Sequence, residues 1–463
     1  MKRSPTLVLP TWIADEITQV ARQRDEAGAV LLAGLAKTDM GLRLLGRELC
    51  WIPDGAYDRR TPHALSIRSS GYVGALALAA ERGDVPIWLH THPGHLSDPT
   101  RSEHDEVVDE KLRETFRVRS GADVYASIVA SPTDHAFQFT ATVWEKGDAF
   151  MSSDRLFVVG DRFALHTAYD AEADTRVPEH FDRQVRAFGG DVQRVLRQLR
   201  IAIVGCGGTG SATAEQLARL GVGHLLLVDH DVLSASNVTR VYGSSPADVG
   251  RPKVDVLGDH LRRIAPTTDV ATVQGSINDI SVARALLGSD VVYGCTDDNA
   301  GRLVLSRLAT HYLVPVIDVG VLLSSDCGIL RGIDGRVTVL TAGSACLVCR
   351  NRIDLARAAA EQLPDDERAA RQAEGYAPEL AGVEPAVVAY TSAAASFAVA
   401  ELLERFIGYG PDPEPSEFLL RCHDREISTN TVQPRPRHYC HPATGVLGCG
   451  DREPFLGQFW RQS

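Results

Sequence analysis

The sequence predicts an α/β protein in which an N-terminal α+β domain precedes a Rossmann-like domain with a mainly parallel sheet. Three observations lead to this prediction. The 463 residues suffice for about three domains, or for two large ones. From Arg200 onward, apolar strand-like segments alternate with helical ones, as in βαβ units. A glycine-rich loop directly follows the first of these strands, which is typical of a Rossmann-like sheet.

The elements of the first domain, residues 1–150, follow from hydrophobic periodicity. We expect two helices, within residues 10–26 and 69–83, and strands at 27–36, 42–52 and 86–92, with paired strands within 120–145. Residues 151–180 have no clear period and carry an acidic run. The sequence therefore predicts a linker at 151–180.

The second domain is expected at 181–463, with an amphipathic helix over 180–199 at its start. Short apolar segments predict buried strands at 200–205, 224–229, 290–295 and 314–320. A polar, helix-prone stretch at 354–382 precedes a long apolar helix at 385–408.

Composition excludes several classes of protein. The chain has 48 Lys and Arg against 60 Asp and Glu, a net charge of −12, which argues against a nucleic-acid scaffold. We find no apolar stretch long enough for a transmembrane helix or a secretory signal, so we expect a cytoplasmic protein without a membrane partner. Nine cysteines, an odd number in a long chain, do not form a disulfide framework.

A histidine-rich segment near residue 90 predicts a metal site. His90 and His92 are two residues apart on an expected strand, so their side chains share one face. Asp105 follows after a loop and can be a third protein ligand. Three protein ligands with a fourth position for water are the arrangement of a catalytic zinc site, where zinc activates the water and polarises the scissile carbonyl.

These residues resemble the JAMM (JAB/MPN) metalloproteases, whose pattern is His-x-His-Pro followed by Ser-x-x-Asp. The chain matches it at His90 to Pro93 and at Ser102 to Asp105, and Glu26-Ala-Gly28 matches the upstream Glu-x-Gly. The resemblance implies zinc on both histidines and the aspartate, Glu26 as the proton shuttle, and Ser102 as support for the oxyanion.

The loop between the two halves of this pattern is two residues longer than in the family. For this reason His95, Asp98 or His104 could enter the metal site instead. A histidine-rich surface loop without a metal is the alternative interpretation.

A second motif indicates a nucleotide site. Gly205, Gly207, Gly208 and Gly210 follow a buried strand and let the backbone approach a phosphate at a helix N-terminus. Asp229 ends the next strand, where a carboxylate can bond to ribose hydroxyls. A nicotinamide dehydrogenase would show the same features.

The residues that follow favour a triphosphate. Asp231, Asn237, Arg240 and Lys253 come in order after the second strand, and two cations near the loop suit a triphosphate better than a dinucleotide. Asp297 ends a further strand, where a carboxylate can hold Mg²⁺ against the phosphates.

This set resembles the adenylating domain of ubiquitin-activating enzymes and of the bacterial (ThiF/MoeB-type) enzymes that activate sulfur carriers. The matching elements are GCGGTGS, Asp229-His-Asp231, Asn237-Val-Thr-Arg240, Gly250-Arg-Pro-Lys253, Cys295-Thr-Asp297 and the lead-in FDRQVRAFG. Asp298 departs from the pattern, because the family often has Asn there.

The resemblance implies that a C-terminal carboxylate, commonly that of glycine, attacks the α-phosphate of MgATP and gives an acyl adenylate and pyrophosphate. Arg240 and Lys253 would neutralise the phosphates, Asp297 would position magnesium and Asp229 would bind the ribose. Arg183 of the lead-in would cross the interface of a homodimer toward the partner's ATP.

Four cysteines late in the chain have the spacing of metal ligands. Cys346-x-x-Cys349 together with Cys440 and Cys449 predicts a closed structural zinc site. His438 or His441 could replace Cys449, and a redox pair or unligated core thiols are the alternatives. For a thioester step the candidates are Cys327 and Cys422, of which Cys327 is expected to pack in the core, while Cys206 and Cys295 lie inside nucleotide motifs.

These patterns together predict a bifunctional enzyme of a ubiquitin-like modifier system. Its metalloprotease half would trim the modifier precursor or remove it from targets, and the other half would adenylate the modifier, both at high effective concentration. Sulfur-carrier chemistry that ends in a thiocarboxylate is the alternative, and a non-catalytic docking scaffold is a third possibility. The expected partner is a small protein that ends in Gly. A separate conjugating enzyme is a possible second partner, and nucleic acid is not expected as a partner.

Overall fold

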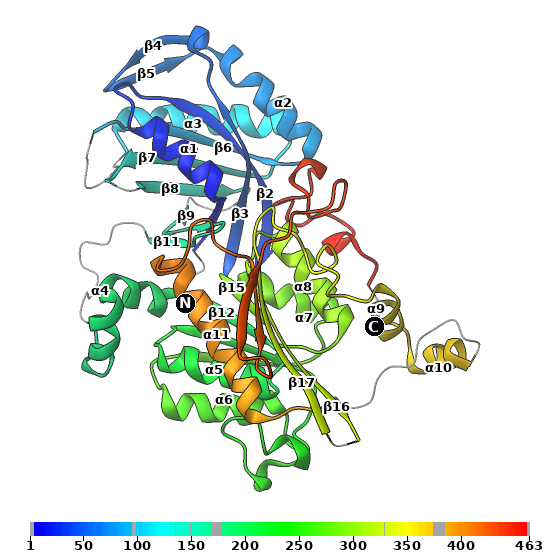
Figure 1. Ribbon diagram of the computed structural model, residues 1–463. Helices are drawn as coiled ribbons and strands as arrows, with labels where there is room; N and C mark the ends of the chain where they lie inside the picture. Colours follow the sequence, from blue (N-terminus) through cyan, green and yellow to red (C-terminus); the bar gives the residue numbers. More distant parts are fainter. Residues whose placement is uncertain are drawn as a thin grey trace. The chain divides into compact units, whose positions relative to one another are not determined.

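The computed structural model describes residues 4–94, 99, 101–134, 136–147, 151–167, 177–327, 329–373 and 385–460. The chain forms two compact units, whose elements are labelled in Figure 1. The first unit comprises residues 1–173, 311–313 and 445–452, and the second unit comprises 174–310, 314–444 and 453–463. Both contain helices and a mixed sheet, which confirms the predicted α/β class, while the JAB/MPN-like character of the first unit stays a prediction.

Among the described residues, the first unit contains a nine-stranded mixed sheet in the order β11-β10-β1-β3-β2-β6-β7-β8-β9 and a separate β4-β5 hairpin. Its strands are β1 Thr6–Pro10, β2 Gly28–Thr38, β3 Gly41–Trp51, β4 Tyr57–Thr61, β5 Ala64–Ile67, β6 Val85–Thr91, β7 Val124–Pro132, β8 Phe137–Glu145, β9 Met151–Ser152, β10 Arg155–Val159 and β11 Ala164–Thr167. Its helices are α1 Thr11–Ala21, α2 Val73–Arg82 and α3 Glu103–Ser120.

Helices cover both faces of this sheet because its central strands are apolar on both. On β2, Leu31 packs with α1 in one cluster, whereas Val30 and Leu32 pack in another with Leu76 of α2 and Phe116 of α3. Alternate residues of a strand point to opposite faces. The sheet is therefore the middle of three layers.

The predicted helices and strands of residues 10–52, 69–92 and 120–145 are confirmed, but two parts of the expectation are wrong. Residues 151–167 are strands that complete the sheet, with β10 parallel to β1, so they are not a linker. Helix α3 was not expected. Its mean hydropathy is low and its sequence is mostly charged, which masks the apolar period that would have revealed it.

The second unit contains an eight-stranded sheet, within the described ranges, in the order β14-β13-β12-β15-β16-β17-β18-β19. The strands are β12 Arg200–Val204, β13 His224–Asp229, β14 Asp269–Gln274, β15 Val291–Gly294, β16 Val316–Asp326, β17 Ile329–Leu340, β18 Glu417–Arg421 and β19 Glu426–Asn430. Strands β14 to β16 pair in parallel and β16 to β19 pair antiparallel. The parallel half is Rossmann-like, and the antiparallel half makes the sheet mixed.

The helices of the second unit are α4 Asp182–Gln198, α5 Gly208–Arg219, α6 Lys253–Ile264, α7 Ile280–Ala285, α8 Asn299–His311, α9 Leu355–Glu361, α10 Asp365–Ala373 and α11 Val388–Ile407. The predicted helices at 180–199 and 385–408 are confirmed as α4 and α11. The apolar α11 packs against α5, β16 and β17. No described helix combines the length and apolar character that a membrane span requires.

Residues 445–452 return to the first unit and lie along β2. Gly450 bridges to Leu35, and the Asp451 amide donates to the Leu35 carbonyl at 2.7 Å. At Gly450 φ is +66° and an added Cβ would lie 2.2 Å from the Leu35 oxygen, so this close approach requires glycine. The second domain therefore does not run unbroken to residue 463.

Candidate functional site

The first unit brings three predicted metal ligands together. His90 and His92 lie at and just after the end of β6, and Asp105 lies in the first turn of α3. The two Nε2 atoms are 3.2 Å apart, and the Asp105 oxygens lie 3.4 and 3.6 Å from His90 and His92. Ligands at 2.0–2.2 Å from a tetrahedral zinc are about 3.3 Å from one another. The three side chains therefore fit a zinc ion without rearrangement.

Asp105 is held as a carboxylate by its neighbours. Burial by itself raises its pKa, but the contacts with His90, His92 and Ser102 hold the pKa well below its ordinary value. Burial lowers the pKa of His90. A neutral imidazole and an ionised carboxylate are the forms that bind metal.

Ser102 orients Asp105 in this structure. It is the N-cap of α3, its hydroxyl donates to Asp105 Oδ2 at 2.7 Å, and it accepts from the Asp105 amide. These contacts satisfy both groups locally. Ser102 is therefore a hydrogen-bond partner of Asp105, and its support of an oxyanion stays a prediction.

Glu26 lies two residues before β2, the strand that pairs with β6. Gly28 of β2 pairs with His90 of β6, and the Thr91 amide donates to the Ala27 carbonyl. Glu26 is outside the strand, and its backbone amide donates to the Thr61 carbonyl at 3.1 Å. Its side chain is buried, at 8% exposure. The role of Glu26 as a proton shuttle stays a prediction.

The structure describes the side chain of none of the three alternative ligands near this site. His95 and Asp98 lie outside the described residues. His104 belongs to α3, but its side chain is outside the described set.

In the second unit, the glycine loop joins β12 to α5. Gly205 has φ +93°, and an added Cβ would lie 2.6 Å from the Cys295 oxygen. At Gly210 an added Cβ would lie 1.7 Å from the Gly205 oxygen. The first glycine permits the turn and the last permits the helix to start against it. The N-terminus of α5 therefore opens onto a backbone that a phosphate can approach.

Asp229 fixes this loop from the end of β13. Its Oδ2 accepts from the Cys206 amide at 2.6 Å, and its Oδ1 accepts from the Asp231 amide at 2.8 Å. Asp231 in turn pairs with Lys253, Nζ to Oδ2 at 2.7 Å, which helps to hold the pKa of that carboxyl below its ordinary value against the raising effect of burial. The lysine is thus held in place while its charge is balanced.

Asp297 and Asp298 follow β15 and have different environments. Asp298 accepts from the Gly301 amide at 2.6 Å and from the Asn278 side chain at 2.9 Å, so it caps α8. Asp297 is exposed and faces the cavity. Within the described ranges we find no hydrogen bond or ion pair to its carboxylate, which leaves that carboxylate available to a metal ion.

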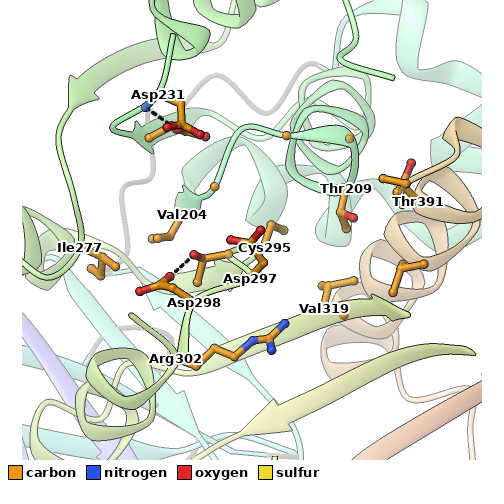
Figure 2. A pocket seen from close by; sticks show the side chains of 18 of the residues that line it. Val204, Thr209, Asp231, Ile277, Cys295, Asp297, Asp298, Arg302, Val319 and Thr391 are labelled. Atoms are coloured by element: carbon orange, nitrogen blue, oxygen red, sulfur yellow. Dashed lines mark hydrogen bonds between the residues drawn. The ribbon is translucent and has the colours of Figure 1, made fainter. Parts of the chain in front are cut away.

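These groups line one cavity of about 1260 Å³. Figure 2 shows Asp231, Asp297, Asp298 and Arg302 around it. Of the predicted nucleotide-site residues the lining includes Gly205, Gly207, Gly208, Asp229, Asp231, Asn237, Arg240, Lys253 and Asp297. Gly210 lies behind the loop. Arg183 is exposed on α4 and does not line the cavity.

Further charged and polar residues line the cavity and belong to none of the motifs described above. They include Asn278, Arg302, Arg336, Arg352, Arg357, Glu361, Arg368 and Arg421. Most come from the antiparallel strands and the segment after them. Of these residues, only Arg302 lies near a motif in the sequence, because it is in the first turn of the helix that follows Cys-Thr-Asp.

The cysteine cluster forms with one change of ligand. Cys346, Cys349, His438 and Cys440 place their ligand atoms together. The Cys349 and Cys440 sulfurs are 3.6 Å apart, and His438 Nδ1 lies 3.6 and 3.3 Å from the Cys346 and Cys440 sulfurs. Contact with Cys440 lowers the pKa of Cys346 to about 5. The thiolate and the spacing fit a structural zinc ion.

The predicted fourth ligand, Cys449, is wrong for this cluster. Cys449 belongs to the first unit, where its backbone lies against Gly34 of β2. The reason is chain geometry, since residues 445–452 leave the second unit before Cys449 is reached. His438, two residues before Cys440, takes the place instead.

The candidate thioester cysteines also differ from expectation. Cys327 is exposed and does not pack in the core, and Cys422 is exposed as well. Cys206 is buried, and burial raises its pKa well above its ordinary value. Burial raises the pKa of Cys295 to about 12. The two cysteines in the nucleotide motifs are therefore poor nucleophiles.

Comparison with known proteins agrees with the second site. The model of the ThiF family matches residues 181–442. The chain belongs to the ThiF family. This ThiF-family chain is 34% identical over 187 residues to molybdopterin-synthase adenylyltransferase of Escherichia coli (strain K12), which is 40% of this chain and 72% of that protein.

Two further relatives are more distant. SAMP-activating enzyme E1 of Haloferax volcanii is 29% identical over 35% of this chain and 56% of its own length. Ubiquitin-like modifier-activating enzyme 5 of Arabidopsis thaliana is 31% identical over 33% of this chain and 38% of its own length. The relatives support the predicted ATP-dependent adenylyltransferase. The family match begins at residue 181, so the hydrolase prediction rests on the geometry of the first unit.

Proposed function

We propose that the second unit of this protein adenylates the C-terminal carboxylate of a small carrier protein with MgATP. The observation that supports this most is the meeting of the glycine loop, the Asp231–Lys253 pair and Asp297 in one cavity of about 1260 Å³. A cavity of this size is large enough for a nucleotide together with the end of a peptide.

The chain's own groups have distinct tasks in this reaction. The loop backbone and the α5 N-terminus bind phosphate oxygens, while Arg240 and Lys253 balance their charge. Asp229 and Asn237 face the nucleoside end, and Asp297 would hold magnesium. When bound, magnesium neutralises charge that develops on the phosphates. A carboxylate oxygen then bonds to the α-phosphorus, the bond to the β-phosphate oxygen breaks, and pyrophosphate leaves with that electron pair.

A sulfur carrier is the substrate class that the comparisons favour. The molybdopterin-synthase adenylyltransferase shares more of its length and sequence with this chain than the modifier-activating relatives do. In this case a sulfide sulfur bonds to the acyl carbon of the adenylate, AMP leaves with the electron pair of the broken bond, and a thiocarboxylate remains. A ubiquitin-like modifier, with a separate conjugating enzyme, is the other possibility.

An exchange assay tests the proposal and separates these substrates. Purified protein, MgATP and labelled pyrophosphate are combined with candidate carrier proteins that end in Gly, and label in ATP is measured. Exchange that requires the carrier supports adenylation, and its absence with every such carrier counts against it. Mass spectrometry after addition of sulfide distinguishes a thiocarboxylate from an enzyme-bound thioester.

A second proposal concerns the first unit, where we infer a zinc-dependent hydrolase acting on the same carrier. It is supported by the short distances among His90, His92 and Asp105 and by the burial of Glu26 just before the strand that pairs with β6. A bound zinc ion would polarise a carbonyl. Glu26 would take a proton from water and return it to the leaving amine. Cleavage of a carrier fusion by the zinc-loaded protein, and its loss with a chelator, is the test.

We also propose a homodimer in which Arg183 reaches the partner's nucleotide. Its exposure on α4 leaves it available for such a contact. Light scattering measures the assembly. Restored exchange on mixing Arg183→Ala with Asp297→Ala protein tests the crossing, because only mixed dimers contain one intact site.

A further inference from the structure

The side chains of two arginines, Arg302 and Arg336, meet at the wall of the cavity next to Gly320. Arg302 comes from the first turn of α8 and Arg336 from β17, directly opposite Gly320 of β16. A Cβ on Gly320 would lie 3.4 Å from Arg336 Nη2 and 3.5 Å from Arg302 Nη2. The two guanidinium groups thus flank one small vacant position. All three residues line the cavity.

A buried carboxylate holds both arginines. Asp318 has no exposed side-chain surface, and its oxygens lie 3.4 Å from Arg302 Nε and 2.5 Å from Arg336 Nη2. Asp318 carries one negative charge and the two arginines carry two positive charges, so the three groups have a net charge of +1. The nearby Cys295 thiol adds no compensating charge, because burial raises its pKa to about 12.

Most of the donors of this pair are not used by the protein. Each guanidinium has five N–H groups. In the described parts of the chain we find one side-chain hydrogen bond from the two groups together, from Arg336 to Asp318. Both side chains remain partly accessible, at 17% and 16% exposure. The pair is therefore positioned and charged, with donors available to an anion from the cavity.

The topology places this pair next to the reacting end of the nucleotide site. Strands β15 and β16 are parallel, with Gly294 opposite Asp318. Strand β15 ends at Gly294 and is followed by Thr296 and Asp297, while β16 continues to Gly320, and all three residues line the cavity. In Figure 2 the Arg302 side chain extends from α8 toward Val319, the residue before Gly320. An anion bound by the two arginines would therefore share the cavity with Asp297, the proposed magnesium ligand.

We propose that Arg302 and Arg336 bind the substrate's C-terminal carboxylate over Gly320 and present it to the α-phosphate. This inference rests on the proposed adenylation. The vacant position accepts a planar carboxylate between two guanidinium groups, and bidentate contact fixes its plane. One carboxylate oxygen forms the bond to phosphorus while pyrophosphate departs. Held in this way, the weak nucleophile is oriented for attack. Asp318 is a positioning residue for the pair.

The test measures carboxylate preference with defined probes. Wild-type protein with Mg²⁺ and the α,β-methylene analogue of ATP is titrated with acetyl-Gly-Gly as the free acid and as the amide, by NMR saturation transfer. We expect the acid to bind at least about tenfold more tightly, since a hydrogen bond to a charged group contributes about 1.5–3 kcal/mol. Gly320→Ala, whose methyl fills the vacant position, and Arg336→Ala should each abolish this preference.

Matched variants control for a general effect on the sheet. Arg331→Ala removes an exposed arginine of the same strand, and Gly332→Ala adds a methyl 3.6 Å from Ser324. Both should keep the preference, and Arg336→Lys should restore part of it. Affinity for the ATP analogue should change by less than about twofold in every variant that keeps the phosphate-binding loop.

Each contrary outcome has a definite meaning. An unchanged preference in Gly320→Ala and Arg336→Ala, or none in the wild type, overturns the carboxylate site while leaving adenylation standing. A tenfold loss of analogue affinity in Gly320→Ala would assign the arginines to a phosphate and overturn the inference in the same way. If the wild type does not bind the analogue, the proposed function fails, and the inference that rests on it fails too.

Discussion

The candidate sites of the two units differ in how many residues form them and in how far apart those residues lie in the sequence. In the first, three side chains from a span of 16 residues, 90–105, converge to within 3.2–3.6 Å of one another. In the second, residues from 204 to 421 surround about 1260 Å³, and several charges there are balanced by partners in the protein. A small ion needs a few ligands at fixed separations, whereas a polyanionic nucleotide needs many donors spread over a surface. This difference makes their sensitivity to mutation separable.

The largest effect is expected from Asp297→Ala. Removal of the carboxylate that would hold magnesium should lower carrier-dependent pyrophosphate exchange by at least about 100-fold, since a metal ion contributes several kcal/mol to such a transition state. Zinc in the first unit should be unchanged, as measured by atomic emission. Asp298→Asn, which keeps an acceptor for the Gly301 amide, is the control and should remain active. Wild-type exchange by Asp297→Ala would refute the assignment.

Glu26 separates metal binding from hydrolysis within the first unit. Glu26→Gln should retain zinc and lose about 10²–10⁴-fold in cleavage of a carrier fusion, the usual contribution of a general base. His90→Ala should lose zinc and cleavage together. Both should retain pyrophosphate exchange. Cleavage by His90→Ala at the normal rate would rule out this metal site.

Variants of the cysteine cluster test whether His438 or Cys449 is its fourth ligand. Cys346→Ser and His438→Ala should each lower the zinc content by about one ion per chain and lower Tm by several degrees, because metal binding contributes to folding free energy. Cys449→Ser should keep that ion, as Cys449 is in the other unit. Zinc analysis and calorimetry measure both quantities. Loss of the ion in Cys449→Ser and its retention in His438→Ala would restore the ligand set inferred from spacing.

The smallest expected effect is a gain. Gly74 lies in the first turn of α2, and an added Cβ would meet nothing within 4 Å. Gly74→Ala should stabilise the first unit by up to about 1 kcal/mol. In calorimetry, a shift of one transition with the other fixed would show that the units unfold separately, whereas a shared shift would show that they unfold together. Destabilisation would contradict the structure of α2.

Much of this could be predicted because the decisive signals are local. The apolar strand that contains His90, the apolar strand that precedes Gly205, and the spacing of Asp229, Lys253 and Asp297 after them are short-range patterns. Parallel strands bring their carboxyl ends to one edge, so those residues were expected in one place, and the cavity contains them.

What escaped prediction depends on long-range pairing. Arg336 reaches the cavity because β17 pairs antiparallel with β16, and no motif surrounds it. The spacing alone leaves Cys449, His438 and His441 open as the fourth ligand of the cysteine cluster, because the path of the chain after Cys440 is set by tertiary contacts. The strands at 151–167 are short, and the first unit's sheet gives them their partners. Pattern alone does not carry such information.

The discontinuity of the first unit limits how the protein can be divided. Its polypeptide is drawn from three separate stretches, and the last, 445–452, supplies the backbone partner of Leu35 and the carboxylate that accepts from the Lys37 amide. A fragment that stops at residue 173 would leave these β2 groups without their partners and exposed to another chain's edge. No single cut in the gene yields this unit whole, so neither unit can be produced intact as a simple N-terminal or C-terminal fragment.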